Sequence, residues 1–282
     1  IDSSSVHRLR DSLGEDEEKL WRERYEQYLR NCTVRKSEED YCTPRVIKEA
    51  IRWLEHTTAQ KKDNLFLWVD LFDPHEPWDP PSPYNRMYTD PAYAGPDLVD
   101  PVPGDVENYM TPEEIRHTKN LYGGEVTFVD KWIGFLLDRI RELKIDDNTL
   151  IVHTSDHGEP FADHGFIRKA RPCNYEELIR IPWIMRHPDH IPAGQDIDAL
   201  VQTVDMMPTL LKMLGIRADN LALPFAGVDQ PGKPGNRFPH DLTDGSKMQP
   251  LQGCDLMPLI EGKADRVRDV AFGGHHKREW YA

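Results

Sequence analysis

The chain has 282 residues, enough for one large domain or two small ones, and its 49 acidic and 35 basic residues give a formal net charge of -14 at pH 7. This charge argues against nucleic acid as the main partner, because binding a phosphate backbone requires a basic surface, whereas a local cationic pocket for a small anionic substrate can form on an acidic protein. No run of about 18 apolar residues occurs, so no membrane span is encoded.

The four cysteines are scattered without the spacing of a zinc ribbon or a disulfide framework, at Cys32, Cys42, Cys173 and Cys254. We interpret them as ordinary thiols. An export signal would precede Ile1, so the sequence is equally compatible with a periplasmic, a secreted and a cytoplasmic protein, and it leaves the oligomeric state open.

Two helices are predicted near the amino terminus. Residues 15–30 are charge-dense and favour a solvent-facing helix. Thr43 is expected to cap a second helix, with Pro44 in its first turn. The expected buried stripes are Leu20, Tyr28 and Leu29 in the first helix, and Val46, Ile47, Ala50, Ile51 and Leu54 in the second.

An apolar run and a proline-rich segment follow. Residues 64–72 are predicted to form a short buried strand. Residues 73–81 carry four prolines, which exclude regular structure and favour an extended loop. The loop is expected to continue through residues 79–110, and loops of this length inside a domain are commonly functional.

The middle of the chain is predicted to form one long helix. Residues 111–114 read Thr-Pro-Glu-Glu, which is a capping box with proline at the first helical position. Gly123 and Gly124 could interrupt the helix. Its expected buried face comprises Val126, Val129, Ile133, Leu137 and Ile140.

The remaining elements are two strands and a helix. The apolar, β-branched residues 149–156 are predicted to be a buried strand, and residues 179–186 a second one. Residues 203–214 are predicted to be a helix that ends at Gly215, and residues 222–250 a loop rich in Pro and Gly. The order strand, helix, strand, strand, helix favours an α/β architecture, in which helices cover a mainly parallel sheet.

The strand at residues 149–156 ends in polar side chains that suit a metal ion. Asp156 and His157 offer one oxygen and one nitrogen ligand at the carboxyl end of the strand, where α/β folds place their sites. Gly158 favours a turn that would bring both side chains together. The alternative is a turn carboxylate beside a surface histidine. Taken alone, the dipeptide favours this alternative over half of a metal site.

Two further residues could act on an anionic group. Lys169 could neutralise an oxyanion of a sulfate or phosphate, although a single lysine is commonly a solvated surface charge. His75 lies in the proline-rich loop and could donate a proton or a hydrogen bond to a leaving oxygen, although a single such histidine is most often an ordinary loop residue.

Five segments, in this order along the chain, closely resemble the sulfatase family within the alkaline phosphatase superfamily. They are residues 66–78, which include Asp-Pro-His-Glu-Pro-Trp, then 124–130, 155–159 with Ser-Asp-His-Gly-Glu, 175–182 and 204–211. The resemblance extends over roughly residues 43–262. It implies an α/β fold with a mainly parallel mixed sheet and helices on both faces, of which this chain carries an incomplete part.

The resemblance also implies roles for individual residues. Asp156 and His157 match the second pair of ligands for an active-site divalent metal, with calcium expected first and manganese or another transition metal as alternatives. Lys169 and His75 match residues that contact the sulfate group, and His75 also faces the ester oxygen. His164 is expected at the rim of the pocket. Two recurrent family positions that look structural are matched by Arg180 and Asp205.

Two parts of the family pattern are missing. The amino-terminal portion of the family carries an Asp-Asp metal pair and a Cys/Ser-x-Pro-x-Arg motif, whose Cys or Ser becomes the formylglycine nucleophile. The Cys-Thr-Pro-Arg that begins at Cys42 is one residue short of this motif and lies too close to His75 for the family order. We therefore expect the carboxyl-terminal part of a sulfatase catalytic domain over residues 1–262, and the beginning of a small subdomain over residues 263–282.

Three functional hypotheses follow. The first is a sulfuric ester hydrolase that cleaves a sulfate monoester, a small anionic substrate, with a divalent metal and a formylglycine that lies outside this chain. The second keeps the fold and changes the substrate to a phosphonate monoester or a phosphodiester. The third is a catalytically inactive fragment, because half a metal site should bind calcium poorly.

Overall fold

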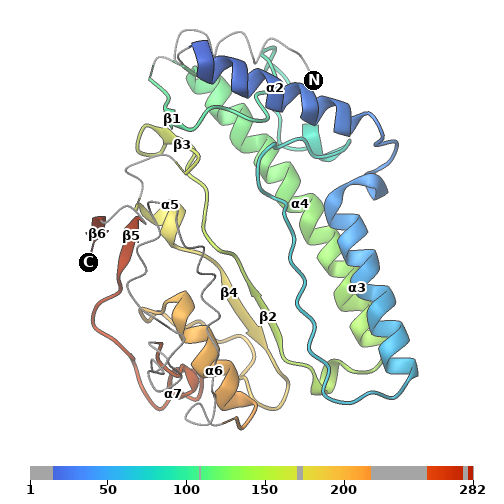
Figure 1. The fold of residues 1–282 in the computed structure, drawn as a ribbon. Coiled ribbons are helices and arrows are strands. Elements are labelled where there is room, and N and C mark those ends of the chain that lie inside the picture. The colour runs from blue at the N-terminus through green and yellow to red at the C-terminus, as the bar shows by residue number, and fades with distance from the viewer. Residues whose placement is uncertain (1–14, 108, 170–173, 217–252, 276–278, 282) are drawn as a thin grey trace, which may run out of the picture. The chain divides into compact units, whose positions relative to one another are not determined.

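The computed structural model describes residues 15–107, 109–169, 174–216, 253–275 and 279–281 (Figure 1). The chain divides into two compact units, Ile1–Ile184 and Met185–Ala282. The described strands form three two-stranded sheets, so the sheet expected from the sequence is present only in part. Cys173 and the predicted loop at residues 222–250 lie outside the described residues. The predicted boundary between a catalytic part and a small subdomain at residue 263 stays a prediction.

Three long helices dominate the first unit. They are α2 (Glu15–Cys32), α3 (Cys42–Ala59) and α4 (Pro112–Glu142). Short 3-10 turns lie between them at Glu38–Asp40 and Tyr84–Arg86, and a third, at Asp146–Asn148, follows α4. All three helices confirm the sequence prediction. None of the helices in the described part of the chain is both long and apolar enough to cross a membrane.

Helix α4 begins with the capping box that the sequence predicts. The Thr111 hydroxyl accepts a hydrogen bond from the Glu114 amide, and the Glu114 carboxylate accepts one from the Thr111 amide at 2.8 Å. The helix continues through Gly123 and Gly124, so the interruption that the sequence allowed does not occur. A Cβ added at Gly124 would lie 2.2 Å from the Tyr84 carbonyl oxygen, so glycine here allows the long loop to contact the helix closely.

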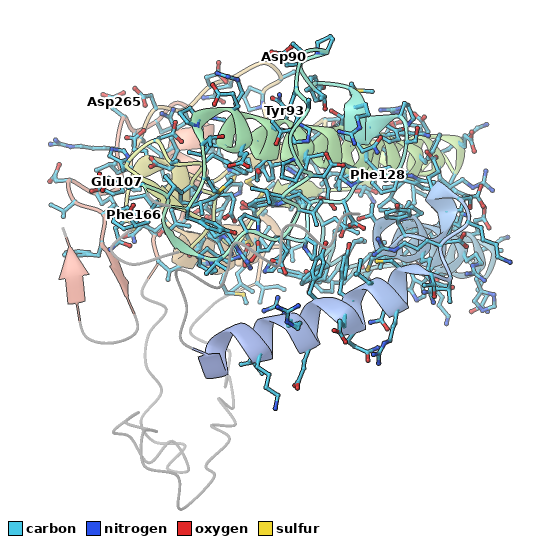
Figure 2. All side chains as sticks on the ribbon, turned by 90° about the horizontal axis from the view of Figure 1, so that it is seen from above. Asp90, Tyr93, Glu107, Phe128, Phe166 and Asp265 are labelled. Atoms are coloured by element: carbon cyan, nitrogen blue, oxygen red, sulfur yellow. The ribbon has the colours of Figure 1, made fainter. Side chains whose placement is uncertain are left out.

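One apolar core lies between α3 and α4. Phe128 of α4 is 1% exposed and lies among side chains of α3 (Figure 2). Val126, predicted to be buried, is 40% exposed, because it lies outside the face of α4 that packs on the core. The buried members of this cluster are Ile47, Ala50, Leu54, Tyr84, Phe128, Trp132, Leu136 and Ile140.

Two details of the first helices differ from the prediction. Leu20 of α2 is 65% exposed, whereas among the described side chains of that helix Tyr25, which the sequence prediction did not include, is buried. Thr43 is not the cap of α3, because the helix begins one residue earlier, after Tyr41. The Thr43 amide and hydroxyl both donate to the carboxylate of Asp73, so the helix start is satisfied by a residue from the proline-rich loop.

The predicted buried strand at residues 64–72 is wrong in two respects. The segment pairs with no strand in the described residues and runs as an irregular stretch alongside α4 (Figure 1). One side of it packs on the core between α3 and α4, through Leu67, Val69 and Leu71. The other side is open, with Phe66, Trp68 and Phe72 exposed at 76%, 68% and 58%. The segment is therefore apolar on both sides, but only one side packs on the core.

The strands are short. Strands β1 (Gly104–Asp105) and β3 (Phe166–Ile167) pair antiparallel, and β2 (Ile151–Thr154) forms a sheet with β4 (Trp183–Arg186). Strand β2 confirms a strand at the centre of residues 149–156, but its residues are half-buried or exposed and not buried as predicted. The prediction for residues 179–186 was too long, because the short helix α5 (Glu176–Ile179) and Pro182 precede β4.

The second unit is built around a buried carboxylate. A 3-10 turn at Thr203–Asp205 leads into α6 (Met206–Met213), and Gly215 ends the helical region at φ 68°, as the sequence predicts. Asp205 is fully buried and accepts from the amides of Gln202 and Cys254, at 2.7 and 2.8 Å, and from Arg268. The other elements are α7 (Met257–Ile260), β5 (Gly273–His275) and β6 (Glu279–Tyr281), with β5 and β6 antiparallel.

Candidate active site

His75 is held by the loop that follows the exposed apolar segment. Its amide donates to the Phe72 carbonyl at 3.1 Å, and its ring packs on the Phe72 ring with centroids 4.4 Å apart. The ring Nδ1 lies 2.6 Å from the Glu76 carbonyl oxygen. A carbonyl only accepts, so we assign the hydrogen to Nδ1, which leaves a lone pair on Nε2.

Lys169 lies directly against that lone pair. Its Nζ is 3.2 Å from His75 Nε2, although the two residues come from distant parts of the sequence. Lys169 follows β3 by way of Arg168, whose φ of 60° is in the left-handed region. The structure therefore brings together the two residues that the sequence predicts as contacts of an anionic group.

A buried carboxylate joins this pair. Glu76 is 1% exposed, and its two oxygens lie 3.4 and 3.3 Å from Lys169 Nζ. Arg168 also donates to Glu76, and its other terminal nitrogen lies 2.7 Å from Asp100 and 2.8 Å from the Pro101 carbonyl. Sequence reasoning missed these three charged residues. The only signal was that Glu76 adjoins His75 and Arg168 adjoins Lys169.

Burial controls the protonation of these groups. Burial, followed by the positive charges of Lys169 and Arg168, lowers the pKa of His75 to about 4, so the ring is neutral at pH 7. Burial also lowers the pKa of Lys169 from its usual value, while the neighbouring Glu159 opposes that shift. Burial raises the pKa of Glu159 to about 7, against the pull of Lys169. In this arrangement Lys169 is the hydrogen-bond donor toward an incoming anion, and His75 Nε2 accepts a hydrogen bond from Lys169.

We expect His75 to titrate near pH 4 and to keep its hydrogen on Nδ1. The folded pKa is below the ordinary value of 6.5, so the neutral ring contributes stability that is present above pH 6.5 and is lost as the pH falls toward 4. NMR of the ring nitrogens of the 282-residue chain measures both properties, with the exposed His56 as an internal reference. A titration midpoint near the ordinary histidine value would contradict the expectation.

Asp156 and His157 lie just beyond the end of β2. The side chain of Asp156 is 87% exposed, and its Oδ2 lies 3.5 Å from His157 Nε2. His157 Nδ1 is 2.7 Å from the Gly158 carbonyl, so the hydrogen is assigned to Nδ1 and Nε2 keeps its lone pair. A Cβ on Gly158 would lie 2.2 Å from the Glu177 carbonyl oxygen, so only glycine fits this turn against α5.

These two residues fit half of a metal site. One carboxylate oxygen and one imidazole nitrogen converge, and the histidine is oriented by a backbone carbonyl, as is usual for metal-bound histidines. Within the described ranges, however, no group of three or more His, Cys, Asp or Glu residues could hold a metal ion. The pair can supply two ligands, and the others would have to come from elsewhere.

The remaining predicted site residues have local partners. The His164 ring stacks on the Tyr175 ring at 3.6 Å, and its Nδ1 lies 2.6 Å from a Glu177 oxygen. Its role at a pocket rim stays a prediction. Arg180 is largely exposed and pairs with Glu176 at 3.4 Å.

A surface hollow lies apart from these residues, between residues 90–96 and the first turns of α4, where Figure 2 labels Asp90 and Tyr93. His117 lines it, but its ring stacks on Tyr93 at 4.1 Å and its Nε2 lies 2.7 Å from Asp97. None of the predicted site residues lines the hollow.

Comparison with known proteins identifies similar chains. An arylsulfatase of Clostridium perfringens is 30% identical over 82% of this chain and 44% of its own length. An N-acetylglucosamine-6-O-sulfatase of Bacteroides thetaiotaomicron is 40% identical over 52% of this chain and 21% of its own length. The chain thus spans less than half the length of these curated relatives.

Solved structures show the same fold. The phosphonate monoester hydrolase of Agrobacterium radiobacter superposes with a TM-score of 0.61 at 24% identity, covering 84% of this chain and 45% of that one. The corresponding enzyme of Silicibacter pomeroyi gives 0.57 at 25% identity, covering 81% and 43%. The fold is therefore the α/β fold of alkaline phosphatase and sulfatase-like proteins, with partial sheets. The family model described as Sulfatase matches residues 11–216, most of the chain, and the chain belongs to the sulfatase family.

Proposed function

We propose that the full protein hydrolyses a sulfate monoester. Family membership supports this class of reaction, and the curated relatives include an arylsulfatase. The observation that supports it most is the 3.2 Å contact between Lys169 Nζ and His75 Nε2, because it places a cationic donor and a neutral imidazole side by side. Such a pair suits the oxygens of a sulfate group, which carry the negative charge.

The proposal includes a divalent metal and a nucleophile from outside this chain. Asp156 and His157 would supply two metal ligands, and calcium is the first candidate because a carboxylate suits a hard cation. The imidazole leaves manganese or another transition metal open. A bound cation would orient the formylglycine nucleophile and neutralise charge on the sulfate oxygens.

Within this chain, the reaction would use Lys169 and His75. Lys169 would donate hydrogen bonds to the sulfate oxygens, where negative charge increases as the ester bond breaks. His75 would keep Lys169 in place by accepting a hydrogen bond at its Nε2 lone pair. Glu159, whose Oε2 lies 3.9 Å from Lys169 Nζ, would limit how far the ammonium moves.

Hydrolysis of an aryl sulfate by the full-length protein tests the proposal. We expect metal-dependent turnover that a chelator removes and that Asp156→Ala abolishes. Asp138→Ala is the matched control, because its carboxylate is 60% exposed on α4 and lies outside the proposed site. Absence of turnover of any sulfate ester, together with robust turnover of a phosphodiester, would overturn it.

A phosphonate monoester or phosphodiester is the second candidate substrate. The similarity to two solved phosphonate monoester hydrolases favours it, and a lysine beside a histidine would bind a phosphonate oxygen by the same chemistry. The ratio of sulfate to phosphonate activity separates the two candidates.

The 282-residue chain alone is proposed to lack hydrolase activity. Asp156 and His157 provide two ligands, whereas calcium takes six or more. Metal-dependent hydrolysis by the chain alone, lost in Asp156→Ala, would overturn this.

A further inference from the structure

We infer that Glu76 is a positioning residue, whose buried carboxylate holds the Lys169 ammonium beside His75 while Arg168 holds Glu76. The inference rests on the proposed sulfate ester hydrolysis for its kinetic consequence. Its structural content concerns only residues of this chain, and can be measured without turnover.

The carboxylate of Glu76 is buried, so water cannot take the place of its protein partners. Its side chain is 1% exposed, and both oxygens lie within 3.4 Å of Lys169 Nζ. A buried carboxylate without partners costs much free energy, so these contacts are kept. Lys169, by contrast, is 31% exposed and so can be reached by a ligand on its open side.

Arg168 anchors the carboxylate from the other side. It is 5% exposed, its amide donates to the Pro160 carbonyl at 3.1 Å, and its guanidinium also contacts Asp100 and the Pro101 carbonyl. Adjacent residues of a strand point to opposite faces, but the left-handed conformation of Arg168 turns the chain. Both Arg168 and Lys169 therefore reach the same carboxylate.

The arrangement also keeps a positive charge available. Glu76 alone beside Lys169 would cancel the charge of the ammonium. Because Glu76 also contacts Arg168, its negative charge is shared between two cations. Lys169 is thereby fixed in position while its charge can still attract the oxygens of an anion.

His75 and Glu76 act as a pair for the same reason. They are adjacent, and Nζ of Lys169 contacts the imidazole of one and the carboxylate of the other. An ammonium has three hydrogens, so these two contacts leave one hydrogen for a ligand. Without Glu76, Lys169 would keep the neutral imidazole and the more distant carboxylate of Glu159, and would sample other positions.

Chemical labelling of lysines in the 282-residue chain tests the positioning directly. We expect acylation of Lys169, mapped by mass spectrometry, to rise severalfold in Glu76→Gln and to stay near the wild-type level in Glu76→Asp. Lys119 and Lys131 report the global fold, since both lie on α4 and pair with Asp163 and Glu38. Unchanged labelling of Lys169 in a folded Glu76→Gln chain would overturn the inference.

A second variant protects the test against unfolding. If Glu76→Gln raises labelling at every lysine, the result for Glu76→Asp decides. Labelling of Lys169 at the wild-type level in a folded Glu76→Asp chain supports the inference. A rise in labelling at Lys119 and Lys131 without a rise at Lys169 overturns it. Glu176→Gln is the matched control, because this carboxylate is 79% exposed on α5.

Kinetics of the full-length protein separate this inference from the proposed function. With an aryl sulfate, Glu76→Gln should lower kcat about 10²-fold with a smaller change in KM, because a misplaced catalytic group slows the chemical step. Glu76→Asp should recover part of the loss. If the wild type shows no sulfate ester hydrolysis, the proposed function fails. The labelling experiment still tests the positioning role of Glu76, because it does not depend on turnover.

Discussion

Replacing Arg168 with methionine should lower the free energy of unfolding of the 282-residue chain by about 3–5 kcal/mol, the cost of removing one partner from a buried ion pair. Arg168, Glu76 and Asp100 have side chains that are 5%, 1% and 5% exposed. Methionine fills a similar volume, so the loss reports the two carboxylates left behind and not a cavity.

The protonation of these groups explains the size of the effect. Burial raises the pKa of Asp100 to about 6 and lowers the pKa of Arg168, so the environment disfavours charge on both. Their contact, with Asp100 Oδ1 2.7 Å from Arg168 Nη1, offsets that cost only while both partners are present. Removal of the guanidinium leaves Asp100 and Glu76 to be desolvated without it.

Urea unfolding followed by circular dichroism measures the change. Arg180→Met is the matched control, because Arg180 is 78% exposed and its contact with Glu176 should contribute little. A loss for Arg168→Met no larger than that of the control would contradict the expectation. The triple variant with Glu76→Met and Asp100→Leu should recover part of the loss, since it removes the unpaired carboxylates as well.

Local patterns in the sequence were sufficient to predict the helices. The capping box at Thr111 and Glu114 sets the start of α4, and the stripe Ile47, Ala50 and Leu54 is buried as expected. These signals depend on residues within a few positions of one another, and the hydrogen bonds that they form are equally local. The acceptor for Thr43 in the first turn of α3 was missed because it is Asp73, which lies far along the chain.

The strand at residues 64–72 shows where apolar pattern is ambiguous. An apolar run does not reveal whether another strand pairs with it, and here none does within the described ranges. Phe66 and Trp68 are therefore exposed while Leu67 packs on the core. A strand forms a sheet only with a partner, and that partner is not a property of the run itself.

The candidate site was predicted in part. The resemblance to sulfatases placed His75 and Lys169 on one anionic group, and the two residues are in contact in the structure. Nothing in the sequence indicated that Glu76 and Arg168 are buried, because charged residues beside prolines or at a strand end are normally exposed. The network depends on contacts between distant segments, which periodicity and spacing do not encode.

Replacing Lys169 with alanine should lower kcat of the full-length protein on an aryl sulfate by about 10²–10³-fold, the usual cost of removing one donor that stabilises developing negative charge. The change also removes the partner of His75 Nε2 and one partner of Glu76. Lys169→Arg should restore little, because a planar guanidinium cannot take the place of a compact ammonium between an imidazole and a carboxylate.

The control and the pH dependence make this expectation specific. Lys119→Ala removes a lysine that is 57% exposed, so its kcat should match the wild type. Burial lowers the pKa of Lys169, so the wild-type rate should fall on the alkaline side as the ammonium loses its proton, and Lys169→Ala should lose that alkaline limb. If Lys169→Ala keeps the wild-type kcat, or keeps the alkaline limb of the pH profile at a reduced rate, the donor role belongs to another group. The limb belongs to the lysine itself, because in the described structure His75 is already neutral over that range and offers only a lone pair.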